Sequence, residues 1–110
     1  MAAGALNAFR TISANVTTNL ETIYTAPAGY TGVVLMAQIS NVSNVTSNVT
    51  FVFHNGTDYE LLKQFDIPKN DAISGTVGKL VLETGSSVKI SGAANNQLKI
   101  VLSLLESANE

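Results

Sequence analysis

Residues 31–42 read Thr-Gly-Val-Val-Leu-Met-Ala-Gln-Ile-Ser-Asn-Val, and this stretch decides the fold class. One parity consists of Val33, Leu35, Ala37 and Ile39, whereas the other parity begins apolar and turns polar. Successive side chains of a strand point to opposite faces, so the pattern predicts a strand whose first parity faces a core. Its β-branched residues, and the lack of a helix cap before it, disfavour a helix.

Residues 47–53 predict the next strand, and the following segment predicts a hairpin. A two-residue Asn55-Gly56 turn would set acidic residues opposite core residues on the same face. A three-residue loop at 54–56, with Gly56 in the left-handed conformation, avoids this conflict, so we expect that loop. It would pair two apolar couples, Phe51 with Tyr59 and Val49 with Leu61.

The remaining sequence predicts further short strands separated by turn residues. Strands are expected at 9–18, 21–25, 58–67, 79–83, 87–91 and 97–106, with 79–83 and 87–91 forming a hairpin and 69–78 a loop. The fold class is therefore all-β: an antiparallel β-sandwich, jelly-roll-like, of seven or eight strands. We expect an N-terminal arm at 1–8, one sandwich domain at 9–106 and a tail at 107–110.

Length, charge and cysteine content exclude several classes of protein. A chain of 110 residues forms one domain, and without cysteine it has no thiolate nucleophile and no cysteine-based zinc site. Its net charge is −2, only 13% of its residues are charged, and its six Lys and Arg are dispersed, which argues against nucleic-acid binding. We expect no signal peptide and no membrane association.

The sequence offers little catalytic chemistry, and we expect neither an enzyme nor a cofactor. His54 is the only histidine, and Asp58 lies near it, but no serine stands in a nucleophile-elbow context. His54 is therefore expected to be a hairpin-loop residue. The acids Asp58, Asp66 and Asp71 lack EF-hand spacing, which leaves open whether loops from different strands bind calcium.

Sugar binding is a competing hypothesis that rests on two aromatic side chains. Tyr24 and Tyr30 flank the Pro-Ala-Gly turn at 27–29 and would form a small aromatic patch if both were exposed. The chain contains no tryptophan, which carbohydrate-binding surfaces often use. The alternative function is thus a carbohydrate- or receptor-binding β-sandwich module.

Three stretches carry a resemblance to a known family. They are Ile-Tyr-Thr-Ala-Pro-Ala-Gly-Tyr-Thr-Gly-Val-Val-Leu at 23–35, Gly-Lys-Leu-Val-Leu-Glu-Thr-Gly at 78–85 and Ser-Gly-Ala-Ala-Asn-Asn at 91–96. With these stretches the chain resembles the small all-β structural proteins of tailed-bacteriophage virions, of the cyanophage type. The resemblance extends over residues 20–106, and its motifs are turns and strands without an active site.

The resemblance implies a virion structural protein made in the host cytoplasm. The leading expectation is a capsid decoration (cement) protein that binds the major capsid protein or other virion subunits; the alternative is a neck, tail, baseplate or fibre component. We also expect a homo-oligomer, with a trimer favoured. The predicted interface residues are Met1, Ala2, Ala3, Leu6, Phe9, Tyr24, Tyr30, Ile73 and Val77.

Overall fold

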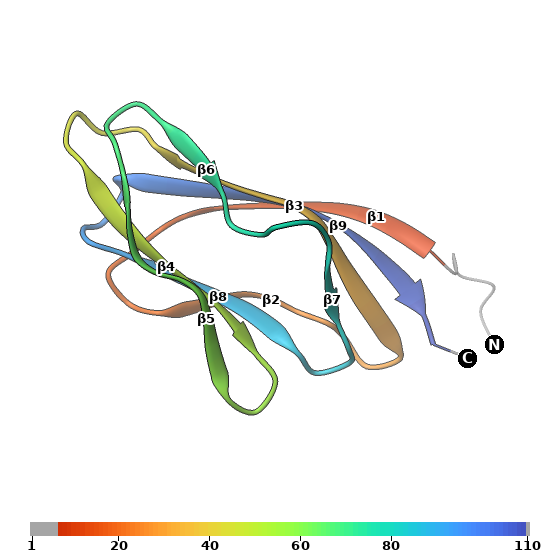
Figure 1. The fold of residues 1–110 in the computed structure, drawn as a ribbon. Helices are drawn as coiled ribbons and strands as arrows, with labels where there is room; N and C mark the ends of the chain where they lie inside the picture. The colour runs from red at the N-terminus through yellow and green to blue at the C-terminus, as the bar shows by residue number, and fades with distance from the viewer. Residues whose placement is uncertain (1–6, 110) are drawn as a thin grey trace.

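The computed structural model describes residues 7–109, and this part of the chain consists of β-strands without a helix (Figure 1). The strands are β1 (Asn7–Asn15), β2 (Glu21–Thr25), β3 (Tyr30–Asn41), β4 (Ser47–His54), β5 (Asp58–Ile67), β6 (Ala72–Ser74), β7 (Leu80–Leu82), β8 (Ser87–Gly92) and β9 (Leu98–Ala108). The all-β prediction is confirmed. The described residues form nine strands rather than seven or eight, because the stretch predicted as a loop at 69–78 contains β6.

The strands form two antiparallel sheets packed face to face (Figure 1). Sheet A has the order β1-β9-β3-β6, with β7 also paired to β3, and sheet B has the order β2-β8-β4-β5. If β6 and β7 are taken as one interrupted strand, the chain alternates between the sheets except at the β4–β5 hairpin. This is the connectivity of a jelly roll.

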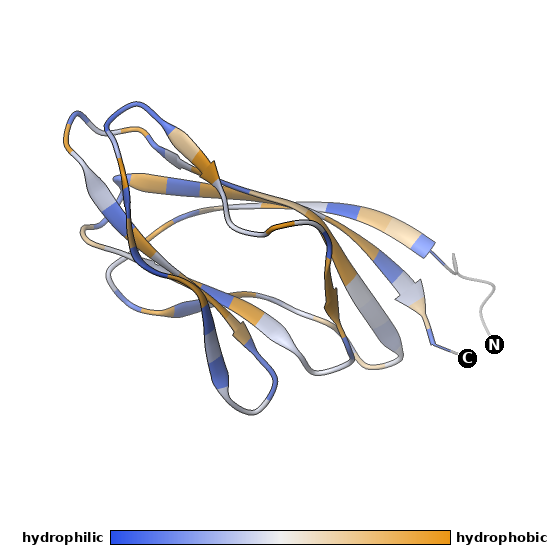
Figure 2. Ribbon diagram, in the orientation of Figure 1, coloured by the Kyte–Doolittle hydropathy of each residue, from blue (hydrophilic) through white to orange (hydrophobic). Residues whose placement is uncertain are grey.

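The core lies between the two sheets. The inward residues of β9, from Leu98 to Leu104, are completely buried, as the alternation of the last strand predicted. Phe51 and Ile90 of sheet B pack into the same cluster. Figure 2 shows that hydrophobic residues recur along the strands of both layers, which is the pattern of a sandwich with a shared interior.

A β-bulge in β3 makes half of the predicted core face wrong. The pairing with β9 shifts between Val34 and Met36, so one extra residue changes the parity of the strand. Ala37 and Ile39 are buried as predicted, but before the bulge Val34 is buried in their place, and Leu35 is 37% exposed. Alternation alone cannot show a bulge when both parities are apolar, as they are here.

The β4–β5 hairpin has the predicted loop length but a different register. Its loop is residues 55–57, with His54 opposite Asp58 and Phe53 opposite Tyr59, so the predicted pairing of Phe51 with Tyr59 is wrong. Gly56 has a φ of 94°, the left-handed conformation that was expected there. Further shifts in the ladder place Val49 opposite Phe65, so its predicted pairing with Leu61 is wrong as well.

The predicted hairpin of residues 79–83 and 87–91 is also wrong. β7 pairs with β3 in sheet A, whereas β8 pairs with β2 and β4 in sheet B. The Thr84-Gly85-Ser86 turn therefore carries the chain from one sheet to the other. Its backbone is joined to residue 26 by two hydrogen bonds, from Ala26 N–H to Ser86 O at 2.9 Å and from Gly85 N–H to Ala26 O at 3.0 Å.

The ends of the sandwich differ slightly from the predicted limits. β1 begins at Asn7, within the stretch predicted as an arm, and β9 continues to Ala108, within the predicted tail. Residues 1–6, the rest of the predicted arm, lie outside the described residues.

The bulge in β3 gives the first testable prediction. Val34→Ala should lower the free energy of unfolding by about 2 kcal/mol, because it removes completely buried methyl groups and leaves a cavity. The matched control is Leu35→Ala at the adjacent, solvent-facing position, with an expected loss below about 1 kcal/mol. Urea unfolding measures both, and a larger loss for Leu35→Ala than for Val34→Ala would show that the strand follows the simple alternation instead.

Candidate interaction surfaces

The structure separates the predicted interface residues into exposed and buried groups. Phe9 on β1 is 80% exposed, and Val77, between β6 and β7, is fully exposed. Tyr30 and Ile73 are half-buried, and Ile73 packs against the core. Tyr24 is buried, with 7% exposure, and so does not present a ring to solvent. Met1, Ala2, Ala3 and Leu6 lie outside the described residues.

Burial of Tyr24 contradicts the exposure on which the aromatic patch depended. Its hydroxyl donates a hydrogen bond of 2.6 Å to Glu106 Oε2, and Arg10 Nη1 lies 3.5 Å from the same oxygen. An alanine Cβ at Gly32 would lie 3.0 Å from the ring atom Cε2 of Tyr24, so the ring lies directly against the backbone of β3. Tyr24 thus connects sheet B to sheet A and has a structural role.

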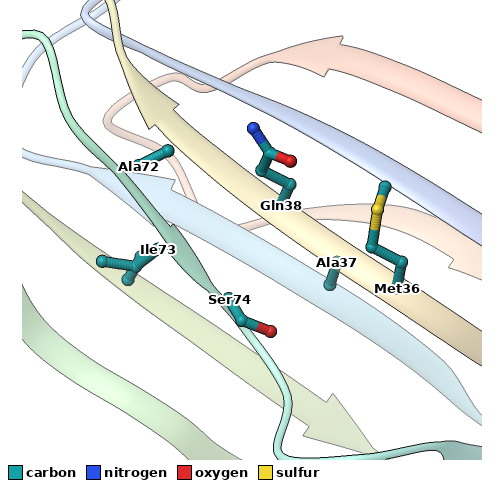
Figure 3. Close-up of a pocket in the computed structure, with 6 residues that line it drawn as sticks. All are labelled: Met36, Ala37, Gln38, Ala72, Ile73 and Ser74. Carbon is teal, nitrogen blue, oxygen red and sulfur yellow. The ribbon is translucent and has the colours of Figure 1, made fainter.

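The first groove lies at the edge of sheet A, where β6 pairs with β3 (Figure 3). It is a shallow hollow of about 330 Å³ lined by Met36, Ala37, Gln38 and residues 72–74. Figure 3 shows Met36 and Gln38 on one side of β3 and Ala37 on the other. The groove exists because β6 and β7 pair with different parts of β3 and leave a gap between them.

A second groove lies at the open edge of the sandwich, between β5 and the segment that joins β6 to β7. We call it the edge groove. It has a volume of about 280 Å³ and is lined by Leu61, Leu62, Ser74, Gly75, Thr76, Val77, Lys79 and Leu80. Among the described residues that line it, Lys79 alone is charged, so the edge groove is suited to apolar contact.

The only histidine lies in a small polar cluster on sheet B. His54 is the last residue of β4, and its Nδ1 lies 2.6 Å from Asp58 Oδ1. Lys89 of β8 donates a hydrogen bond of 3.1 Å to the same carboxylate oxygen. The bond from Lys89, and then the one involving His54, lower the pKa of the Asp58 carboxyl from its ordinary value. The sequence placed His54 in the loop, whereas the structure places it in the strand and joins the hairpin to β8 through Asp58.

Residues 7–109 contain neither a cluster of metal-ligand side chains nor a helix suited to span a membrane. No three side chains of the His, Asp or Glu type come together there in a group that could hold a metal ion. Over the same residues, no helix has the length and hydrophobicity needed to cross a membrane.

Sequence reasoning missed several exposed hydrophobic residues on the outer side of sheet A. Val81, Met36, Leu35 and Val101 are 54%, 38%, 37% and 37% exposed, respectively. The only signal for Val81 was its parity, opposite to that of Leu80 and Leu82. Parity was also the signal for Val101, which lies between the buried Ile100 and Leu102. The exposure of Leu35 and Met36 follows from the bulge, which the sequence does not show.

Comparisons with known proteins support the fold. By sequence, the chain matches no protein-family model and no curated protein. By structure, it is similar to a chain of the acid-stable capsid of Helicobacter pylori bacteriophage KHP30, with a TM-score of 0.59 and 12% identity over 96% of this chain and 90% of that chain. It is also similar to a subunit of Bacillus endospore appendages, described as disulfide-linked pili, with a TM-score of 0.57 and 13% identity over 99% and 98% of the two chains.

A third similar structure is a chain of the T13 IBDV viral particle, with a TM-score of 0.54 and 11% identity. That match covers 96% of this chain but 32% of the longer viral chain. At these identities the comparisons establish the fold alone. All three structures are of subunits from large assemblies.

The link between Tyr24 and Glu106 gives a second prediction. Tyr24→Phe should lower the free energy of unfolding by about 1–3 kcal/mol, because it leaves the buried Glu106 carboxylate without its shortest hydrogen bond. Tyr30→Phe is the matched control, since Tyr30 is half-buried and its hydroxyl makes no such bond to a buried acid. Equal stability of the two variants in urea unfolding would contradict the structural role of Tyr24.

The same link gives a prediction at alkaline pH. Burial, followed by the hydrogen bond to Glu106, raises the pKa of Tyr24 well above its ordinary value of 10.0. The stabilisation is therefore fully present below pH 10 and is lost as the pH rises from there toward the raised pKa, because only the unfolded state gives up the proton. The stability difference between wild type and Tyr24→Phe should be smaller at about pH 11 than at about pH 9. A constant difference across this range would contradict the assignment.

Proposed function

We propose that this chain is a structural subunit of a virion, and specifically a decoration (cement) protein on the capsid of a tailed bacteriophage. The observation that carries the proposal is the jelly roll shared along almost the whole chain with a subunit of a bacteriophage capsid. The resemblance of residues 23–35, 78–85 and 91–96 to small proteins of cyanophage virions supports the same class. The major capsid protein is the proposed partner.

The pilus fold neighbour suggests a different assembly, but its chemistry does not transfer. That structure is described as a family of disulfide-linked pili. The present chain contains no cysteine, so its copies cannot be joined by disulfides. A cement role requires only non-covalent contact and is compatible with a surface of low charge and exposed apolar residues.

We propose the edge groove as the contact with the shell. Val77 stands fully exposed at its rim, and Leu61 of β5 is 40% exposed on the other side. These residues offer an apolar hollow for a protruding apolar side chain of the shell, and Lys79 would pair with an acidic neighbour of that side chain. Residues 74–77, which include the predicted interface residue Val77, form one wall of this groove.

The role proposed here consists of binding alone, without catalysis. His54 supports this reading because it is paired with Asp58, which also binds Lys89, so the cluster has a structural use. The carbohydrate-binding alternative is less well supported, since Tyr24 is buried. Copy number per virion distinguishes decoration from a neck, tail, baseplate or fibre location. A decoration protein is present in a number comparable to that of the shell subunits, whereas a neck or tail protein is present in the number of a single ring.

A binding experiment tests the edge groove. Purified chain is added to phage capsids that lack it, and the bound copies and the thermal stability of the shells are measured. Val77→Asp should weaken binding at least about tenfold, because it places a charge on the apolar rim. Val45→Asp is the matched control, a valine with 48% exposure in another loop, and it should bind like the wild type.

Two outcomes of this experiment would count against the proposal. If the wild-type chain does not bind the capsids and does not raise their thermal stability, the decoration role is wrong. If Val77→Asp and Val45→Asp bind equally well, the shell contact lies elsewhere on the surface.

A further inference from the structure

The outer side of sheet A carries an unbroken apolar row across four strands. Phe9 of β1 lies opposite Leu105 of β9, Leu105 lies opposite Val33 of β3, and Val33 lies opposite Val81 of β7. Directly paired residues of adjacent strands share one face of the sheet. This face points away from the core, because the neighbouring positions Leu104 and Val34 are the completely buried ones. We call Phe9, Leu105, Val33 and Val81 the apolar row.

The rest of this face is nearly free of charge. Met36 and Val101 lie on it beside the apolar row, and most of its other paired residues are Ser, Thr, Asn and Gln. Among the paired residues of this face in the described chain, only Lys99 is charged, and it lies at the end of the sheet remote from Phe9. A solvent-facing side of an antiparallel sheet ordinarily carries charged residues and few large apolar ones, so an apolar row on a face with a single charge indicates a surface that another molecule covers.

From these observations we propose that the outer face of sheet A binds the same face of a second copy of this chain, forming a two-fold dimer. A face with almost no charge has no like-charge repulsion against itself. With strands of 9 residues in β1 and a sheet four strands wide, the face measures about 30 Å by about 19 Å, or about 570 Å². Two such faces bury about 1,100 Å² in total, which reaches the lower limit of about 1,000 Å² for a specific interface.

The positions of the apolar row select one of two possible two-fold axes. An axis parallel to the strands, between β9 and β3, sets Phe9 over Val81 of the partner subunit and Leu105 over the partner subunit's Val33. An axis perpendicular to the strands and through Thr11, the middle of β1, would instead set the apolar row over the polar level of the partner subunit's Ser13 and the partner subunit's Gln38. A perpendicular axis through the row itself would overlap only residues 7–11 of β1 and so bury less area. The first arrangement is therefore favoured, with the two sheets about 10 Å apart and their strands within about 30°.

This dimer rests on the proposed role in an assembly. It adds to that role a partner, a second copy of the chain, and a two-fold symmetry. It predicts a two-fold dimer in place of the trimer favoured from the sequence. None of the four residues of the apolar row lines the edge groove, and Ser74 is the paired residue of the dimer face that does. The two proposals can therefore fail separately.

Sedimentation equilibrium of the full 110-residue chain tests the dimer. From about 1 µM to about 1 mM, the mass should rise from that of a monomer to that of a dimer. Phe9→Asp and Val81→Asp should each weaken the dimer at least about tenfold, because both side chains are exposed in the monomer and buried in the pair. Val77→Asp, on the edge groove, should leave dimerisation unchanged.

Cysteine cross-linking tests the axis of the dimer. The chain has no cysteine of its own, so a Phe9→Cys, Val81→Cys double variant carries only the introduced thiols. Within one subunit these positions are three strand spacings, or about 14 Å, apart, too far for a disulfide. Facing sheets are about 10 Å apart, also too far for a direct disulfide, so the test uses a bifunctional thiol reagent that spans about 10 Å. This reagent should give a covalent dimer, whereas a Val77→Cys, Val45→Cys control should not be cross-linked.

The other outcomes contradict the dimer, its axis or the decoration role, and each can be told from the others. A wild-type chain that stays monomeric throughout this range contradicts it, as does an oligomer that Phe9→Asp and Val81→Asp leave intact. Failure of the double-cysteine variant to cross-link contradicts the two-fold axis along the strands. A monomer that still binds capsids removes the dimer alone, and a dimer that does not bind capsids removes the decoration role alone.

Discussion

The pairing of β3 with β9 is the constraint on which the rest of the molecule depends. These two long strands are paired from Tyr30↔Ala108 to Asn41↔Leu98, and both are flanked by further strands of sheet A. One side of the pair buries the main aliphatic residues of the core, and the other side carries the half-buried central part of the apolar row. A change of register here by one residue would exchange the two sides and place the core residues in solvent. The bulge at Leu35 makes such an exchange locally, without disturbing the inward residues of β9.

Most strands could be predicted from the sequence because their side chains alternate. The limits of β2 were predicted to the residue, and those of β3, β4 and β8 within one residue. What could not be predicted is the choice of partner. Residues 79–83 and 87–91 look like a hairpin because they are short and close in sequence, yet they pair into different sheets. A local pattern shows which face of a strand is buried, but it does not show which strand lies beside it.

The exposure of surface residues was less predictable than the strands, because it too depends on which strands become neighbours. Phe9 and Val77 are apolar residues that a local pattern marks as exposed, and both are exposed. Tyr24 was misjudged because its burial depends on Glu106, 82 positions away in the sequence, and on the bare backbone of Gly32. The apolar row was missed because it exists only across β1, β9, β3 and β7. None of its four members is unusual within its own strand.

The scarcity of charge on the outer face of sheet A and in the edge groove has a consequence for the conditions under which contacts there would persist. Dissolved ions weaken attractions between exposed charges by screening them, and contacts of this composition contain almost none to screen. Hydrocarbon contact instead weakens on cooling, because its driving force near room temperature is largely entropic. An assembly built through these surfaces should therefore dissociate less at high salt concentration than at low temperature.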